Sequence, residues 1–147
     1  MRVRVATAAP PFANKSALTG MHETEPYAML GLAMAEFRKG DAGAAAATLD
    51  HLFASNPDFN SIEADLLAAR ILEVRGCLAE ALSAYERLSA TYPGEEAKGR
   101  MALLLQRTGA EPRARAMFAE IRKSVERGPA FYRRAQREWY EIARRHA

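Results

Sequence analysis

The chain has 147 residues, and its 49% hydrophobic and 27% charged residues are typical of a globular protein and exclude a disordered or fibrous one. The single cysteine, Cys77, excludes an internal disulfide, and no apolar run approaches the ~20 residues that a membrane-spanning helix needs. The net charge of +3 is uneven, because residues 1–93 carry −3 and residues 94–147 carry +6. The basic C-terminal third is either a solvated helical surface or an electrostatic site for an acidic partner.

The first 23 residues differ in character from the rest of the chain. They contain Pro10 and Pro11, show no helical period and have no acidic residue before Glu23. We expect a poorly ordered or extended tail over residues 1–23, with packing into a groove as the alternative. The two prolines interrupt this basic, alanine-rich start before a signal-peptide core forms, so a cytoplasmic location is expected.

Three segments that are helical in composition each end at a glycine. They span residues 27–41, 63–77 and 96–110, and their glycines are Gly40, Gly76 and Gly109, spaced by 36 and 33 residues. A glycine just past a helix takes the left-handed conformation that satisfies the last carbonyl groups and turns the chain. The next helix after Pro57 can be capped by Asn60 or Ser61, with Glu63 placed for a capping box from Asn60.

A second helical stretch follows each glycine and repeats a small and a large residue. The alanine comes five residues after the glycine and the large side chain four residues later, as Ala45, Ala81 and Ala114, then Leu49, Tyr85 and Phe118. Alanine lets two helices approach closely, and the large residue lies on the same face one turn later. Pro57 and Pro93 then end the first two units.

This pattern resembles the tetratricopeptide repeat, which has a 34-residue period. The resemblance covers residues ~25–127, and the small residue of the first helix is present as Ala33, Ala69 and Ala102. The family's large aromatic is missing, with Met29, Asp65 and Lys98 in its place. The resemblance implies an all-α fold: a right-handed superhelix of three antiparallel helix hairpins, at 26–59, 62–94 and 95–127, within a single domain over 24–147.

The C-terminal stretch predicts a capping helix over residues 129–146. Its apolar side chains recur at helical spacing as Phe131, Tyr132, Ala135, Trp139, Ile142 and Ala143. Their first interpretation is a core that covers the last hairpin, and their second is contact with a partner. The opposite face forms a candidate basic surface of Arg133, Arg134, Arg137, Arg144 and Arg145. Segments 131–139, 56–59 and 92–97 are similar to a bacterial subgroup of the family whose members carry an N-terminal hydrophobic anchor, which is absent here.

Residues that could carry chemistry are isolated from one another. No two of His22, His51 and His146 stand at metal-ligand spacing, and no histidine falls near Cys77 in the repeat register. Glu95 and Glu96 are interpreted as helix-start acids that favour the positive end of the helix dipole. No catalytic residue, metal site or cofactor is therefore predicted, and we expect a protein that is not an enzyme.

The resemblance implies that the first helices line a concave face that binds extended peptides or helices. The residues that the resemblance places in this partner-binding groove are Tyr27, Leu30, Met34, Phe37, Glu63, Leu66, Arg70, Glu73, Arg100, Leu103, Gln106 and Arg107. Apolar residues at the positions where relatives clamp a terminal carboxylate favour an apolar or amphipathic partner segment with some acidic residues.

Function therefore has three candidates at this point. The expected one is a non-catalytic protein–protein interaction scaffold, and the same surface could instead form a homodimer. Nucleic-acid binding through the basic C-terminal helix is disfavoured, because Glu138 and Glu141 lie on that helix.

Overall fold

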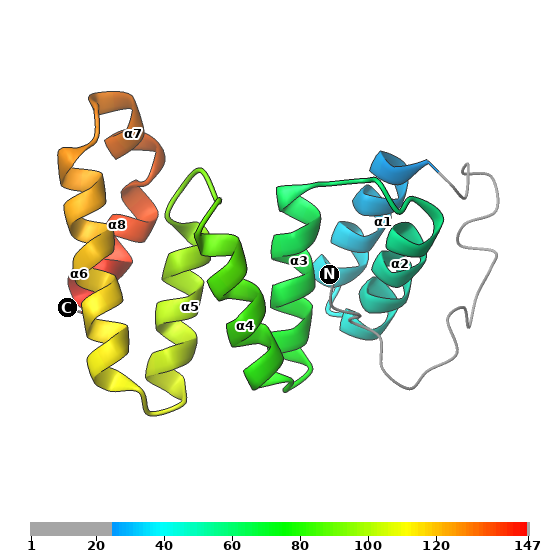
Figure 1. Ribbon diagram of the computed structural model, residues 1–147, viewed down its shortest axis with the longest axis horizontal. Coiled ribbons are helices and arrows are strands. Elements are labelled where there is room, and N and C mark those ends of the chain that lie inside the picture. The colour runs from blue at the N-terminus through cyan, green and yellow to red at the C-terminus, as the bar shows by residue number, and fades with distance from the viewer. Residues whose placement is uncertain (1–24, 147) are drawn as a thin grey trace. The chain divides into compact units, whose positions relative to one another are not determined.

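The computed structural model describes residues 25–146, and every regular element in that range is an α-helix (Figure 1). The expected all-α class is confirmed. The chain divides into two compact units, with the boundary between Ala81 and Leu82 inside α4 (Leu78–Ser89). The expected N-terminal tail, residues 1–23, lies outside the described residues.

The first unit contains α1 (Pro26–Arg38), α2 (Ala42–Ser55), α3 (Ile62–Val74) and the start of α4. Helices α1 and α2 form a hairpin, and α3 packs on α2 and touches α1. Small residues make this packing close, since Ala33, Ala45 and Ala46 are fully buried beside Leu49 and Leu52. The repeated alanines therefore lie at helix contacts, as the sequence pattern predicted.

Three turns in the described residues share one hydrogen-bonding pattern. Gly40, Gly76 and Gly109 have φ angles of 90°, 83° and 90°. At the first, the Gly40 N–H donates to the Phe37 carbonyl and the Asp41 N–H to the Glu36 carbonyl, both at 3.0 Å. The same pair of bonds recurs at the other two turns. This is the Schellman arrangement, and it confirms the left-handed glycine expected from the sequence.

Side chains also cap the helices of the first unit at their N-termini. The Ala64 N–H donates to the Ser61 hydroxyl at 3.2 Å, so Ser61, and not Asn60, caps α3. The Ala44 N–H donates to the Asp41 carboxylate at 2.9 Å at the start of α2. Each cap satisfies a backbone donor that the first helical turn leaves free.

The second unit contains the rest of α4, α5 (Glu96–Arg107), α6 (Glu111–Arg127), α7 (Ala130–Ala135) and α8 (Arg137–Arg145). Helices α5 and α6 form a hairpin, and α8 packs on both of them (Figure 1). Ala102, Ala114 and Phe118 are buried at these contacts. Helix α8 thus covers the α5–α6 hairpin in the way that α3 covers α1 and α2.

The C-terminal segment departs from the single helix expected over 129–146. Two helices, α7 and α8, meet at Gln136, whose backbone has left the regular helix (φ −100°, ψ 14°). The Gln136 side chain accepts a hydrogen bond from the Glu95 N–H at 2.8 Å, which holds the bend. Phe131 and Ala135, expected on the apolar face of one helix, are instead exposed.

Candidate functional site

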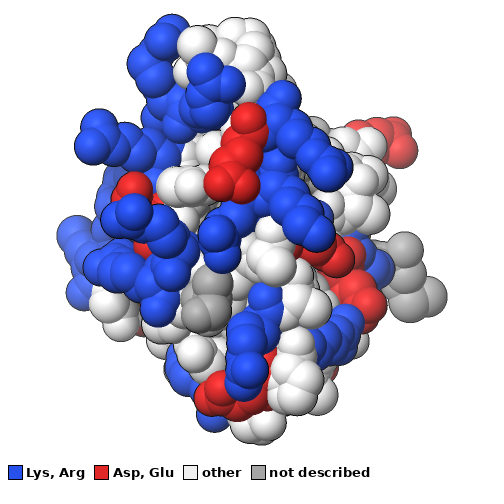
Figure 2. Space-filling view, turned by 90° about the vertical axis from the view of Figure 1, so that its left-hand side faces the viewer, with Lys and Arg blue, Asp and Glu red and all other residues white. Residues whose placement is uncertain are grey.

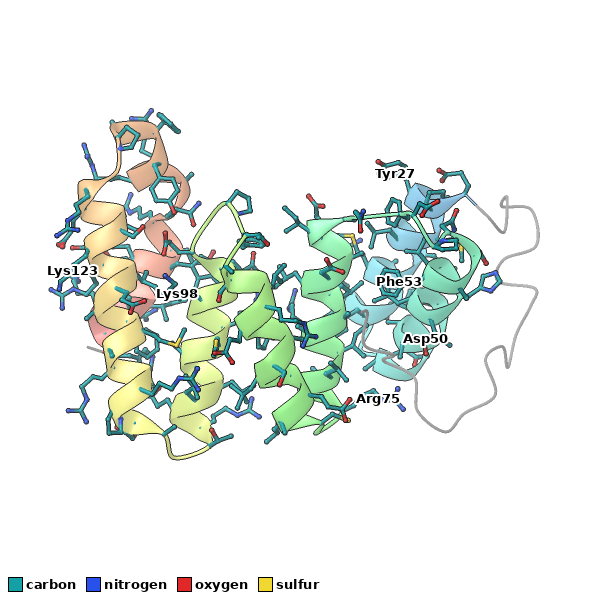
Figure 3. All side chains as sticks on the ribbon, in the orientation of Figure 1. Tyr27, Asp50, Phe53, Arg75, Lys98 and Lys123 are labelled. Carbon is teal, nitrogen blue, oxygen red and sulfur yellow. The ribbon has the colours of Figure 1, made fainter. Side chains whose placement is uncertain are left out.

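The first-helix face of unit 1 is formed by α1 and α3, and we call it the α1–α3 face. The Arg70 guanidinium lies 4.9 Å from the centre of the Phe37 ring, so the two helices present these side chains together. Met34, one turn before Phe37 on α1, is 37% exposed. Tyr27 begins α1, is 73% exposed and meets the Phe59 ring edge-on at 5.4 Å (Figure 3).

The remaining expected groove residues of unit 1 separate into buried and accessible groups. Leu30 and Leu66 are only 7% and 8% exposed. They form the floor of the face and offer almost no surface to a partner. Glu63 is exposed and Glu73 is half-buried. The accessible part of the expected site in unit 1 is therefore Tyr27, Met34, Phe37, Glu63, Arg70 and Glu73.

The expected groove residues of unit 2 include one that is already engaged within the chain. The Arg100 Nε donates to the Glu96 carboxylate at 2.8 Å, and its guanidinium lies 5.3 Å from the centre of the Trp139 ring. Leu103 and Gln106 are half-buried, and Arg107 is exposed. Arg100 thus holds α8 against α5, which the repeat register alone does not indicate.

A basic surface covers α6, α7 and α8. Figure 2 shows this face with many Lys and Arg side chains and fewer acidic ones among them. The five predicted arginines are all exposed: Arg133, Arg134, Arg137, Arg144 and Arg145. Arg133 Nη1 donates to the Gly128 carbonyl at 2.5 Å, and Arg144 pairs with Glu141 at 3.2 Å.

A buried polar cluster ties α7 to the start of α5. The Glu95 carboxylate is buried, and it accepts hydrogen bonds from the Tyr132 hydroxyl and, at 2.9 Å, from the Ser124 hydroxyl. Burial, and the hydrogen bond and negative charge of Glu95, raise the pKa of Tyr132 to about 12. The interpretation of Glu95 as a simple helix-start acid was therefore incomplete, because its carboxylate serves a tertiary contact.

Three glycines make room for the C-terminal helices in unit 2. A Cβ atom at Gly99, in the middle of α5, would overlap the Trp139 ring. A Cβ at Gly94 would meet the Gln136 amide, and one at Gly128 would meet the Tyr132 ring. The glycine inside α5 was the one sequence signal of this docking, since glycine in a helix interior is destabilising without a packing reason.

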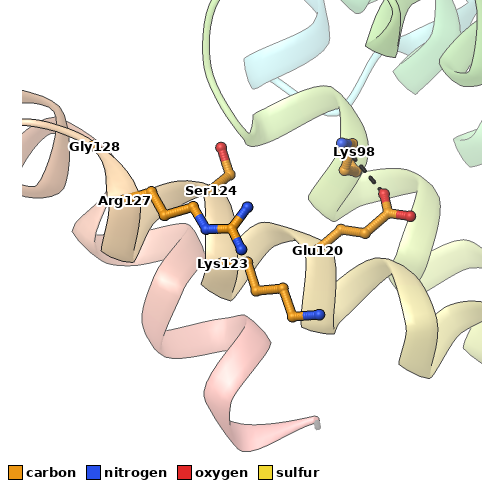
Figure 4. Close-up of a pocket in the computed structure, with 6 residues that line it drawn as sticks. All are labelled: Lys98, Glu120, Lys123, Ser124, Arg127 and Gly128. Carbon is orange, nitrogen blue, oxygen red and sulfur yellow. Dashed lines mark ion pairs between the residues drawn. The ribbon is translucent and has the colours of Figure 1, made fainter.

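A hollow that includes Ser124 of the polar cluster is lined by three basic side chains and one acidic one. It measures about 490 Å³ and is lined by Lys98, Glu120, Lys123, Ser124, Arg127 and Gly128 (Figure 4). Lys98 comes from α5 and Lys123 from α6 (Figure 3). Figure 4 shows Lys98 directed toward Glu120, with which it pairs at 3.4 Å. We call this hollow the basic pocket.

Of the residues considered for chemistry, His22 lies outside the described range, and His51, Cys77 and His146 belong to different segments of the chain. His51 lies 3.5 Å from the Ser55 hydroxyl, and Cys77 is half-buried in its turn. Within residues 25–146, no group of three or more His, Cys, Asp or Glu side chains could hold a metal ion. In the same range, no helix has the length and apolar character to cross a membrane.

Comparison of the chain with protein-family models, curated proteins and solved structures finds no match.

Proposed function

We propose that this chain is a non-catalytic scaffold that binds a peptide or helical segment of a partner protein on the α1–α3 face. The proposal includes a tetratricopeptide-type stacking of the hairpins and a cytoplasmic location. The observation that carries it is the accessible mixture of Met34, Phe37 and Arg70 on two adjacent helices. Apolar side chains next to a cation suit an amphipathic segment, which supplies both apolar contacts and an acidic group.

The arrangement of this face supports a bound segment better than a small ligand. The residues lie along α1 at helical spacing, from Tyr27 through Met34 to Phe37, and so follow a line along the helix axis. Leu30 and Leu66 fill the space beneath that line. Such an elongated surface can contact the apolar face of a helix along its length, whereas its filled floor leaves little depth for a small ligand.

Selection from a random peptide library tests this proposal. Peptides enriched on the wild-type protein are expected to lose at least about tenfold in affinity toward Met34→Glu, because a carboxylate then enters the apolar contact. Ala54→Glu, a matched charge change at an exposed position of α2, is the control and is expected to bind within about twofold of wild type. The proposal would be contradicted if the enriched peptides bound Met34→Glu as tightly as wild type, or if the selection enriched no peptide.

A further inference from the structure

We propose that the basic pocket of unit 2 binds an acidic, extended segment of a partner protein through carboxylate contacts to Lys123 and Arg127. This site is separate from the α1–α3 face, and the inference does not depend on it. Lys123 and Arg127 stand four residues apart on α6 and therefore on the same side of the helix. Both side chains line the hollow of about 490 Å³.

The positive charge of these two residues is not neutralised by their neighbours. Glu120 pairs with Lys98 at 3.4 Å, and the Glu126 carboxylate accepts a hydrogen bond from Tyr140 at 3.0 Å. Among the residues that the structure describes, neither Lys123 nor Arg127 has an ion-pair partner. Like charges four residues apart destabilise a helix, so an anionic ligand would relieve a repulsion as well as form contacts.

Another cation, Arg133, lies close to the pair within the same unit. Ser124 and Gly128 line the hollow with them, and Arg133 bonds to the Gly128 carbonyl and so lies at its rim. The face that Figure 2 shows is basic as well. An extended polyanion fits such an open site on a charged face better than a small enclosed ligand does.

The composition of the pocket favours an acidic peptide over a nucleic acid. Glu120, which lies in the lining and pairs with Lys98, can accept hydrogen bonds from the N–H groups of a peptide backbone, whereas a sugar–phosphate backbone has no N–H group to donate. None of the six described lining residues has an aromatic ring on which a base could stack. The chain's own first 22 residues do not fit, because they carry Arg2, Arg4 and Lys15 and no acidic residue.

Fluorescence anisotropy tests this inference on the full chain. The probes are a fluorescein-labelled peptide of alternating Glu and Ser, the same peptide with Gln in place of Glu, and a single-stranded DNA oligonucleotide of similar length. The Glu peptide is expected to bind, with an affinity that falls as salt rises, and the Gln peptide is expected not to bind. The double variant Lys123→Gln, Arg127→Gln is expected to bind the Glu peptide with an affinity at least about tenfold lower than that of wild type.

Arg113→Gln combined with Arg115→Gln is the matched control, because both residues are exposed on α6, lie outside the pocket and remove the same charge. It is expected to change the affinity by no more than about twofold, and circular dichroism checks that all variants are folded. An equal loss in the control would show attraction by net charge alone and overturn the site. Absence of Glu-peptide binding, or tighter binding of the DNA, would also overturn it.

Discussion

Glu95 is a buried glutamate, whereas most glutamates lie at the protein surface. Its carboxylate is buried and accepts hydrogen bonds from two hydroxyl groups, of Ser124 and Tyr132. Burying a carboxylate is costly unless hydrogen bonds replace the water it loses. The two hydroxyls supply that compensation, since the carboxylate makes no capping hydrogen bond at the N-terminus of α5. Removing one of these donors should therefore lower the stability of the fold.

Tyr132→Phe tests how much one hydroxyl donor to Glu95 contributes to stability. The substitution keeps the ring and removes one of the two donors, so we expect the free energy of unfolding to fall by about 1–3 kcal/mol. Tyr140→Phe is the control, because the Tyr140 hydroxyl bonds to Glu126 at an exposed site, and we expect a loss below about 1 kcal/mol there. Urea denaturation measures the free energy of unfolding of both variants. Equal losses would show that the hydrogen bond to Glu95 contributes no more to stability than an exposed one.

The same hydroxyl predicts a pH dependence at alkaline pH. The pKa of Tyr132 is raised from 10.0 to about 12 in the folded protein, so the fold holds this proton more tightly than the unfolded chain does. The stabilisation is complete below pH 10 and is lost as pH rises toward 12. Over that range the melting temperature should fall more steeply in wild type than in Tyr132→Phe. The other tyrosines are common to both proteins, so parallel curves would contradict the assignment.

At the scale of elements, helix α5 is shaped by the helix that docks on it. Gly99 lies inside α5, where alanine would ordinarily be preferred by about 1 kcal/mol. The Trp139 ring of α8 occupies the space where a Cβ would stand. The Arg100 guanidinium lies over the same ring, 5.3 Å from its centre, while it pairs with Glu96. Gly99 thus lowers the helix propensity of α5 but allows α5 and α8 to pack closely.

Gly99→Ala is accordingly expected to destabilise the protein by about 1–3 kcal/mol, because the added methyl group forces the Trp139 ring away. Gly31→Ala is the matched substitution, since Gly31 lies inside α1 with no atom within 4 Å of an added Cβ. It should stabilise the protein by roughly 0.5–1 kcal/mol through helix propensity alone. Thermal unfolding measures both, and a shift of the same sign in the two variants would refute the packing explanation.

The hairpins could be predicted from the sequence because their signals are local. A glycine that ends a helix, with an alanine five residues later, fixes a turn and a close contact within about ten residues. Ser61 and Gly76 are read from their immediate neighbours in the same way. Only the choice between Asn60 and Ser61 needed the structure, since both residue types cap helices well.

The docking of α7 and α8 could not be predicted because it joins residues distant in sequence. Glu95 and Tyr132 are 37 positions apart, and helical periodicity alone suggested one continuous helix through Gln136. Which residues of the α1–α3 face are accessible could not be predicted, for a related reason. Helical spacing places Leu30 on the same side of α1 as Met34, and Leu66 on the same side of α3 as Arg70, but burial depends on how the neighbouring helices pack.

At the scale of the whole molecule, charge is divided between the two compact units. Residues 25–81 carry 4 Lys/Arg and 9 Asp/Glu, whereas residues 82–147 carry 14 and 8. The α1–α3 face belongs to the acidic unit and the basic pocket to the basic one. Since each proposed site lies within one unit, a substitution in one site should leave binding at the other unchanged.

The α1–α3 face is proposed to bind another protein, and self-association through the same face is the main alternative. Light scattering on a sizing column, for wild type and Met34→Glu, separates the two. Our expectation is a molar mass near the 16.2 kDa of one chain for both proteins. A wild-type dimer that Met34→Glu converts to monomers would contradict it, because the face would then be occupied by a second copy of the chain.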